Sequence, residues 1–369
     1  MIPNSFAPFA DVASYLALPP AHTSAPLAAA LVENLGVRRL AEPPQVSVLD
    51  VRTHHDLEFT QLSWNVGYGP ATHAWFVHPS GVDPAALPGV LALHAHGGVR
   101  SVAAEVLLED GESSSRALQI RQAHYEGLAP VNDLAAQGFA VLVHDAFSWG
   151  SRRLTLSSQP ADDDATRVHP DGSYQRRAPA NAEAYDEEMK AFEPRLASWA
   201  SLLGSSLAGM VVGEDLVALD VLASLSGGQL GAFGLSGGGA RTVYLSAIDP
   251  RLAAVTVCCA MTTWSSMVPH HVTRHSTLNI PPTLARLAEM PEIACPPGGP
   301  TALLAQFGES DPLFPLEGMQ AADEWMRRNR EVDGAPYLGR HYQAGHVMSQ
   351  AMQRDAWTFF REHLGSAQN

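Results

Sequence analysis

Hydrophobic residues gather in short runs along this chain, and turn-forming residues separate the runs. Residues 89–95 and 139–144 contain no Asp, Glu, Lys or Arg. A strand in the middle of a parallel sheet is covered by helices on both faces, so it is expected to be apolar along its whole length. Residues 129–137, between these two runs, have the pattern of a helix. The sequence therefore predicts an α/β fold with a mostly parallel central sheet flanked by helices.

The other apolar runs extend the predicted sheet. Three antiparallel starting strands and four later strands are expected, in chain order, at residues 46–51, 57–64, 73–77, 229–233, 253–258, 302–307 and 337–342. Further helices are expected at residues 240–247 and at about 349–363. Residues 1–44 are rich in Ala, Leu and Pro and predict an N-terminal helical extension packed outside the sheet, whereas residues 45–369 predict one α/β domain.

Residues 148–203 interrupt the alternation of strands and helices. They show no strand pattern, but residues 180–200 are helix-like, with Tyr185, Phe192 and Trp199 spaced seven apart. Long segments between sheet elements are often functional lids, so we expect a cap insertion over the strand ends; the alternative is ordinary surface packing or a solvated charged loop. Residues 261–274 are a second candidate wall. The candidate pocket residues are His96, Trp149, Trp264 and Met267.

The most specific motif is Gly234-Leu-Ser236-Gly-Gly238, which lies between the predicted strand at 229–233 and the predicted helix at 240–247. In a G-x-S-x-G motif at this place the serine occupies a sharp, strained turn, and its hydroxyl is raised above the sheet edge. Glycines are needed two residues before and after the serine because Cβ atoms there would collide. The motif predicts that Ser236 is a catalytic nucleophile; the alternative is a glycine-rich turn with an incidental serine.

Two further residues follow in the order that such a nucleophile requires. Asp311 comes just after the predicted strand at 302–307, and His346 follows the strand at 337–342. A serine hydroxyl is a poor nucleophile until an imidazole takes its proton, and a carboxylate must hold that imidazole in the correct tautomer. We therefore predict a triad of Ser236, His346 and Asp311. Glu309 and Asp145 are competing candidates for the acid.

Residues His96, Gly97 and Gly98 follow the buried strand at 89–95 and offer backbone N–H groups for an oxyanion hole. With the N–H of Gly237, directly after the nucleophile, Gly97 and Gly98 are the expected donors. His96 is expected to orient this loop. His94 and His96 are also spaced as a metal pair would be, but no third ligand is near them in sequence, so no metal is expected.

The chain resembles α/β-hydrolases of the dienelactone hydrolase and acetyl xylan esterase-like group. The resemblance extends from about residue 75 to the C-terminus and is carried by residues 94–98, 142–152, 213–222, 234–239, 290–293 and 311–315. It implies the α/β-hydrolase fold, with Ser236, Asp311 and His346 as the triad. Dienelactone hydrolases proper have a cysteine nucleophile, whereas this chain has Ser236, so dienelactone chemistry is not implied.

These observations predict a serine hydrolase that cleaves a small-molecule carboxylic ester with a small acyl group and needs no cofactor. Hydrolysis of an amide, lactone or carbon–carbon bond by the same triad is the first alternative, and a non-catalytic hydrolase-like binding protein is the second. The net charge of −15 argues against nucleic-acid binding. No signal peptide or membrane span is evident, and three cysteines give no disulfide framework, so a cytoplasmic location away from membranes is expected. A homo-oligomer is compatible with the sequence.

Overall fold

The computed structural model describes residues 26–154, 179, 181–268, 271–296, 298–299 and 301–365. At its centre is a nine-stranded sheet with the strand order β1-β2-β3-β5-β4-β6-β7-β8-β9. The strands are β1 (Ser47–His54), β2 (Leu57–Trp64), β3 (Thr72–Pro79), β4 (Gly89–Leu93), β5 (Ala140–His144), β6 (Leu230–Leu235), β7 (Leu252–Cys258), β8 (Ala302–Gly308) and β9 (Tyr337–Tyr342). The neighbouring pairs β1–β2, β2–β3 and β3–β5 are antiparallel, and all remaining pairs are parallel.

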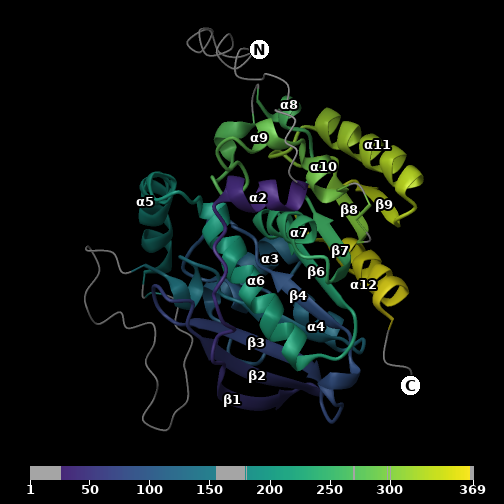
Figure 1. The fold of residues 1–369 in the computed structure, drawn as a ribbon. Helices are drawn as coiled ribbons and strands as arrows, with labels where there is room; N and C mark the ends of the chain where they lie inside the picture. Colours follow the sequence, from purple (N-terminus) through teal and green to yellow (C-terminus); the bar gives the residue numbers. More distant parts are fainter. Residues whose placement is uncertain are drawn as a thin grey trace.

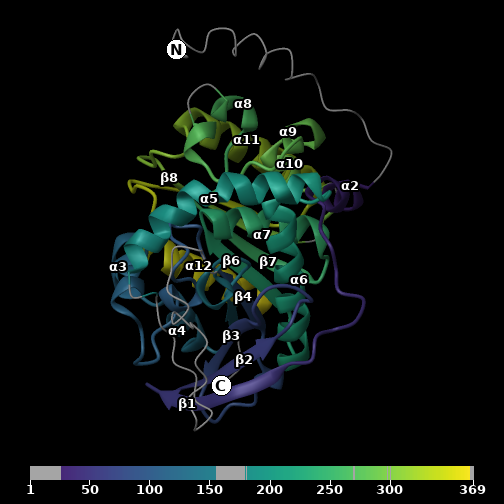
Figure 2. The ribbon, with the colours of Figure 1, turned by 90° about the vertical axis from the view of Figure 1, so that its left-hand side faces the viewer.

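Helices cover both faces of this sheet (Figures 1 and 2). They are α2 (Leu27–Leu35), α3 (Ser115–Tyr125), α4 (Pro130–Ala135), α5 (Ala182–Leu202), α6 (Leu207–Leu225), α7 (Gly237–Ile248), α8 (Trp264–Met267), α9 (Leu284–Leu287), α10 (Met290–Ala294), α11 (Leu316–Asp333) and α12 (Gln350–Leu364). One apolar core lies under α6, α7, α10 and α11, and a second lies under α3, α4 and α12. The predicted mostly parallel sheet flanked by helices is therefore confirmed.

Burial explains the composition of the strands. Every residue of β4 and β5 is buried, which accounts for their continuously apolar sequence. At the edge of the sheet, β1 is largely exposed and carries an irregularity between Val48 and Asp50 that interrupts its pairing with β2. An interrupted edge strand that carries charged side chains is less able to pair with another chain.

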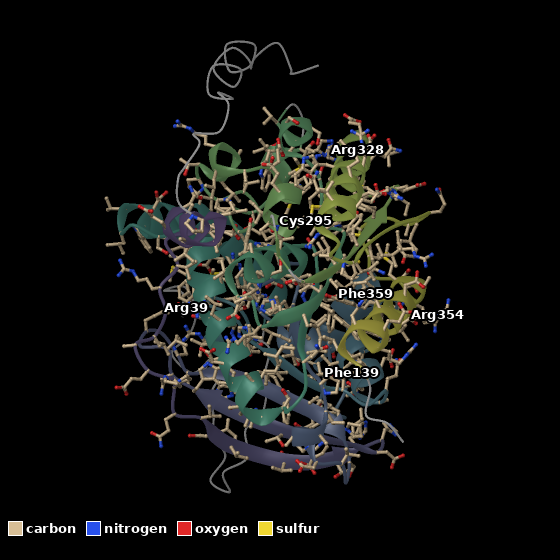
Figure 3. The ribbon with its side chains drawn as sticks, turned by 45° about the vertical axis from the view of Figure 1, so that its right-hand side comes forward. Arg39, Phe139, Cys295, Arg328, Arg354 and Phe359 are labelled. Carbon is tan, nitrogen blue, oxygen red and sulfur yellow. The ribbon has the colours of Figure 1, made fainter. Side chains whose placement is uncertain are left out.

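The two helices near the C-terminus show how the surface and the core divide (Figure 3). On α11 and α12, the side chains of Arg328 and Arg354 are exposed, whereas Phe359 is buried. Phe139, directly before β5, packs against Phe360 of α12, with the ring centroids 6.4 Å apart. This contact joins α12, which follows the predicted catalytic histidine, to the middle of the sheet.

Helix α3 is absent from the sequence-based expectation. It buries Ala117, Arg121 and Tyr125, so its inward face is not purely apolar. The Arg121 guanidinium donates to the backbone oxygens of Glu105, Val106 and Leu108. A buried arginine that satisfies backbone carbonyls conceals the hydrophobic period that predicts a helix.

The predicted N-terminal extension and cap are described only in part. Residues 1–25, 155–178 and 180 lie outside the described residues. Helix α2 packs against α6, α7 and α9, outside the sheet. Within the described residues, no single helix is long and apolar enough to cross a membrane; α5 and α6 pass such a test only as a pair, and they are bent by 80° at the break between them.

Candidate active site

Ser236 lies on the turn between β6 and α7. Its backbone angles, φ 58° and ψ −118°, are rarely adopted by residues other than glycine. A Cβ atom on Gly234 would lie 2.3 Å from the carbonyl carbon of Gly238, and one on Gly238 would lie 2.0 Å from the oxygen of Leu93. The expected collision at both glycines is therefore confirmed. A strained serine at the end of a parallel strand is the backbone geometry of a nucleophile elbow.

His346 and Asp311 lie on loops at the ends of adjacent strands. Asp311 follows β8, and His346 lies between β9 and α12. The Nδ1 atom of His346 is 2.6 Å from Oδ2 of Asp311, and Oδ1 of Asp311 accepts a hydrogen bond of 2.8 Å from the backbone N–H of Leu313. The carboxylate is fully buried and the imidazole is 14% exposed. Since Nδ1 donates to the carboxylate, Nε2 of a neutral imidazole is left as a proton acceptor.

The two competing acids have other partners. The Asp145 carboxylate accepts hydrogen bonds from the backbone N–H groups of Ala104 and Ser151, at 2.9 and 2.8 Å. It therefore joins two loops. Glu309 is half-buried and accepts a hydrogen bond from the Gln343 side chain. Its Oε1 atom lies 3.7 Å from Nδ1 of His341. Asp311 is the acid that the structure brings to His346.

The loop after β4 lies beside the start of α7. A Cβ atom on Gly237 would lie 2.9 Å from the backbone nitrogen of His96, which makes the His96 amide a close neighbour of the elbow. Gly97 and Gly98 both have positive φ, 61° and 67°. The Gly98 N–H, expected as an oxyanion donor, donates instead to Nδ1 of His96 at 3.1 Å. The backbone N–H of His96 is a candidate donor that the sequence analysis missed.

A buried ion cluster fastens this loop to the elbow helix. Asp215 of α6 accepts hydrogen bonds of 2.9 Å from Nε of Arg241 in α7 and from Nε2 of His144 at the end of β5. Arg241 also donates to the backbone oxygen of His94 at 2.9 Å. Burial alone would raise the pKa of Asp215, but Arg241 and His144 lower it to about 2. The charged cluster thus fixes the strand end before the loop against the helix that carries Ser236.

The four candidate pocket residues occupy different environments. The His96 imidazole is partly exposed and bonded to Glu193. Trp149 is buried behind the loop, where its indole N–H lies 3.4 Å from the backbone oxygen of His96. Trp264 and Met267 belong to α8, which packs against α11, and both are buried; the Trp264 indole N–H donates to the backbone oxygen of Ala288. Trp149 therefore supports the loop, and Trp264 and Met267 line neither of the cavities described below.

Helix α5, in the predicted cap segment, contacts the loop through acidic residues rather than through the expected aromatic series. Tyr185 is buried and Phe192 half-buried, but Trp199 is 54% exposed. Asp186 and Glu193, also seven residues apart, accept hydrogen bonds from the segment 96–101. Their spacing places both on one face of the helix. The sequence could suggest this shared face, but not partners that lie 85 to 97 residues earlier in the chain.

Histidine and cysteine side chains near the site have internal partners. His94 and His96, the pair considered as metal ligands, bond to different groups: Nε2 of His94 accepts from the Ala146 amide and Nε2 of His96 bonds to Glu193. Among the described residues, Cys259, Asp311 and His346 each have one possible metal-ligand atom within 4.8 Å of those of the other two. Asp311 and His346 are already hydrogen-bonded to each other.

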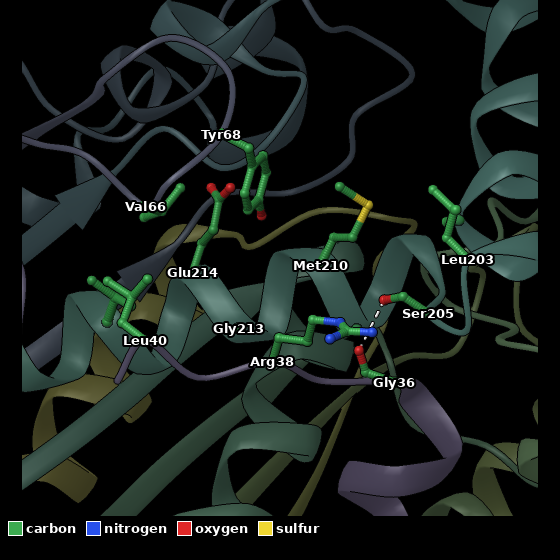
Figure 4. Close-up of a pocket in the computed structure, with 13 residues that line it drawn as sticks. Gly36, Arg38, Leu40, Val66, Tyr68, Leu203, Ser205, Met210, Gly213 and Glu214 are labelled. Atoms are coloured by element: carbon green, nitrogen blue, oxygen red, sulfur yellow. Dashed lines mark hydrogen bonds between the residues drawn. The ribbon is translucent and has the colours of Figure 1, made fainter. Parts of the chain in front are cut away.

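Described residues line a small cavity near the loop after β4 and a larger one elsewhere. The small one, of about 10 Å³, lies beside the loop and is lined by Ala95, Gly97, Val99, Val102, Ile120 and their neighbours, including His124. The His124 ring is 6.5 Å from that of His346. The larger cavity, of about 380 Å³, lies along α6 between Tyr68, Leu40, Met210 and Leu203 (Figure 4). None of the residues that line the larger cavity belongs to the predicted triad or to the loop after β4.

Sequence comparison finds neither a matching family model nor a matching curated protein. Solved structures do match. A proposed acetyl xylan esterase of Bacteroides fragilis has 12% identity and a TM-score of 0.59, with 86% of this chain and 73% of that chain covered. Acetyl xylan esterase from Paenibacillus sp. R4 has 14% identity and a TM-score of 0.52, with coverages of 91% and 92%.

Acetyl xylan esterase 1 from Thermoanaerobacterium sp. has 12% identity and a TM-score of 0.52, with 95% of this chain and 98% of that chain covered. At such low identity the likeness shows the fold alone. The strand order and the elbow at Ser236 agree with it. This chain has the α/β-hydrolase fold, and its structural neighbours include acetyl xylan esterases.

Proposed function

We propose that this protein is a serine hydrolase that cleaves a carboxylic ester through an acyl-enzyme on Ser236. The observation that carries the proposal is the strained elbow at Ser236, followed along the chain by the hydrogen-bonded pair Asp311 and His346. A strained backbone at a serine is typical of a catalytic site, and the acid and histidine follow in the order found in α/β-hydrolases.

In the proposed reaction, Nε2 of His346 takes the proton of the Ser236 hydroxyl while Oγ attacks the ester carbonyl. The carbonyl oxygen becomes negative and is held by the backbone N–H groups of Gly237 and His96. The carbon–oxygen bond to the alcohol then breaks, and His346 returns its proton to the leaving alkoxide. A water molecule, deprotonated by His346, attacks the carbonyl carbon of the acyl-enzyme; the bond to Oγ breaks, the acid leaves, and His346 returns the proton to Oγ of Ser236. Asp311 keeps Nδ1 protonated throughout.

The small cavity beside the loop supports a short acyl group. Its volume of about 10 Å³ is room for roughly one water-sized sphere. The lining is mainly aliphatic, so it suits a methyl group better than a charged one. We assign this cavity to the acyl group, which makes an acetyl ester the proposed substrate class. Several structures of the same fold are named as acetyl xylan esterases, which agrees with this assignment.

The acyl assignment predicts the chain-length preference. Among p-nitrophenyl esters, acetate should be hydrolysed with a kcat/KM at least about tenfold higher than hexanoate, because a missing or excess methylene is worth about 1–3 kcal/mol in a tight apolar pocket. Ile120→Ala enlarges the cavity and should raise the hexanoate-to-acetate ratio. Leu118→Ala, an exposed position on the same helix, is the control.

The measurement is kcat/KM for p-nitrophenyl acetate and hexanoate in the parent protein, Ile120→Ala and Leu118→Ala. An unchanged ratio in the folded Ile120 variant would show that the acyl chain lies elsewhere. No hydrolysis of any ester in the series would contradict the proposed reaction itself.

A further inference from the structure

Glu193 lies at the junction of three separate segments. Its Oε2 atom accepts hydrogen bonds from Nε2 of His96, at 2.7 Å, and from the Arg100 guanidinium. Its Oε1 atom accepts a hydrogen bond of 2.5 Å from the hydroxyl of Ser276. The carboxylate is 11% exposed. One side chain of α5 thus binds the loop after β4 and the segment that follows α8.

The charges around Glu193 keep it ionised. Burial alone would raise the pKa of Glu193, but the hydrogen bond from His96, together with Arg100 and Ser276, holds this pKa well below its ordinary value. Burial lowers the pKa of His96 despite its hydrogen bond to Glu193. A neutral imidazole beside an ionised carboxylate must use its single N–H as the donor to that carboxylate.

This hydrogen bond fixes the tautomer of His96. With the proton on Nε2, Nδ1 is an acceptor, and it receives the backbone N–H of Gly98 at 3.1 Å. In the other tautomer, an N–H on Nδ1 would face the N–H of Gly98, and two donors would oppose each other. The Glu193 carboxylate therefore favours the closed turn at Gly97 and Gly98, both of which have positive φ.

The same helix holds the far end of the loop. Asp186 accepts hydrogen bonds from the backbone N–H groups of Arg100 and Ser101, at 2.7 and 2.8 Å. The Arg100 guanidinium carbon lies 3.5 Å from the centre of the Trp149 ring, so Arg100 is fixed between the indole and Glu193. The turn that carries the His96 amide is thus anchored at both ends by buried carboxylates of α5.

We propose that Glu193 is a positioning residue for the oxyanion hole: it holds His96 in the tautomer that binds the Gly98 amide, and so keeps the backbone N–H of His96 beside Gly237. This inference rests on the proposed ester hydrolysis. Glu193 acts through the loop and does not touch the reacting atoms. Its loss is therefore expected to lower the rate of the chemical step more than the binding of substrate.

The test compares Glu193→Gln, Glu193→Ala and Ser276→Ala in p-nitrophenyl acetate hydrolysis. Glutamine keeps an acceptor for His96 but loses the charge opposite Arg100, so kcat should fall about tenfold; alanine should lower it about 100-fold, approaching the loss of one oxyanion donor. Ser276→Ala, which leaves His96 and Arg100 bonded, should lower kcat less than either. KM should change less than about threefold in all variants.

Glu187→Gln is the matched control, since Glu187 lies on the same helix, is 72% exposed and pairs only with Lys190 among the contacts described. It should keep the kcat of the parent protein. Circular dichroism and thermal unfolding establish that each variant is folded. Should Glu193→Ala leave the structure destabilised by the unpaired Arg100, the glutamine and Ser276 variants still give the comparison.

The outcomes separate the two proposals. A parent protein with no esterase activity, or with activity unaffected by Ser236→Ala, overturns the proposed function and this inference with it. An active parent whose folded Glu193 variants keep kcat within twofold overturns the positioning role alone. A rise in KM at constant kcat also overturns it, because Glu193 would then contact the substrate.

Discussion

Replacement of Ser236 by alanine is expected to reduce ester hydrolysis by on the order of 10⁴-fold or more, because the acyl-enzyme can no longer form. The change removes one oxygen at a position whose Cβ and backbone are retained. Its φ of 58° is strained for alanine as it is for serine, so the fold should persist. Steady-state hydrolysis of p-nitrophenyl acetate measures the loss.

Ser246→Ala is a matched control. Ser246 lies on α7, is buried, and donates only to the Val243 carbonyl within its own helix. This variant should retain the turnover of the parent protein. Near-parental turnover in folded Ser236→Ala protein would mean that the hydrolysis proceeds without this serine.

Asp311→Asn is expected to reduce kcat by up to about 10⁴-fold, because the carboxamide can donate to Nδ1 of His346 and so favours the tautomer with its proton on Nε2. That tautomer presents a donor to the Ser236 hydroxyl and cannot accept its proton. The geometry motivates the prediction: the buried carboxylate lies 2.6 Å from Nδ1 and has its second oxygen engaged by the Leu313 amide. The measurement is kcat for p-nitrophenyl acetate across pH.

Glu309→Gln is the control for this prediction, since Glu309 lies two residues away and bonds to Gln343 rather than to the predicted triad. It should keep kcat within about threefold, because the hydrogen bond between Asp311 and His346 is left intact. If Asp145→Asn abolished turnover while Asp311→Asn remained active, the acid would be misassigned.

The central strands of the sheet were predictable from sequence because they are buried on both faces. Every residue of β4 and β5 is buried, so each strand is an uninterrupted apolar run that can be recognised in the sequence. The elbow was predictable for a different reason. Steric crowding between Gly234 and Gly238 leaves so little freedom that the required residue types form a recognisable motif.

The turn after β4 was predicted in place but not in detail. The glycines at 97 and 98 indicated a tight turn after β4, and the turn is present with positive φ at both residues. Which amide faces the elbow depends on the path of the loop, and that path depends on Asp186 and Glu193 of α5. Contacts between residues so far apart in the chain leave no periodic pattern in a single sequence.

Helix α5 was predicted for its aromatic residues, yet its buried carboxylates make the contacts with the loop. The seven-residue aromatic spacing identified the buried face only in part, since Tyr185 is buried beside Asp186 but Trp199 is 54% exposed. The chemistry of that face was misjudged because charged residues normally point to solvent. Buried acids become favourable only when donors such as Arg100 and His96 are supplied by another segment.

Covalent labelling with a fluorophosphonate tests the central claim most directly, because the reagent reacts with a serine activated by a histidine and an oxyanion hole. The account predicts one phosphonyl group per chain, located at Ser236 by peptide mass spectrometry, with labelling and loss of esterase activity proceeding at the same rate. Ser236→Ala should take up no label. Full esterase activity after exhaustive treatment, or a label on a different residue that parallels inactivation, would contradict the proposal that Ser236 is the nucleophile.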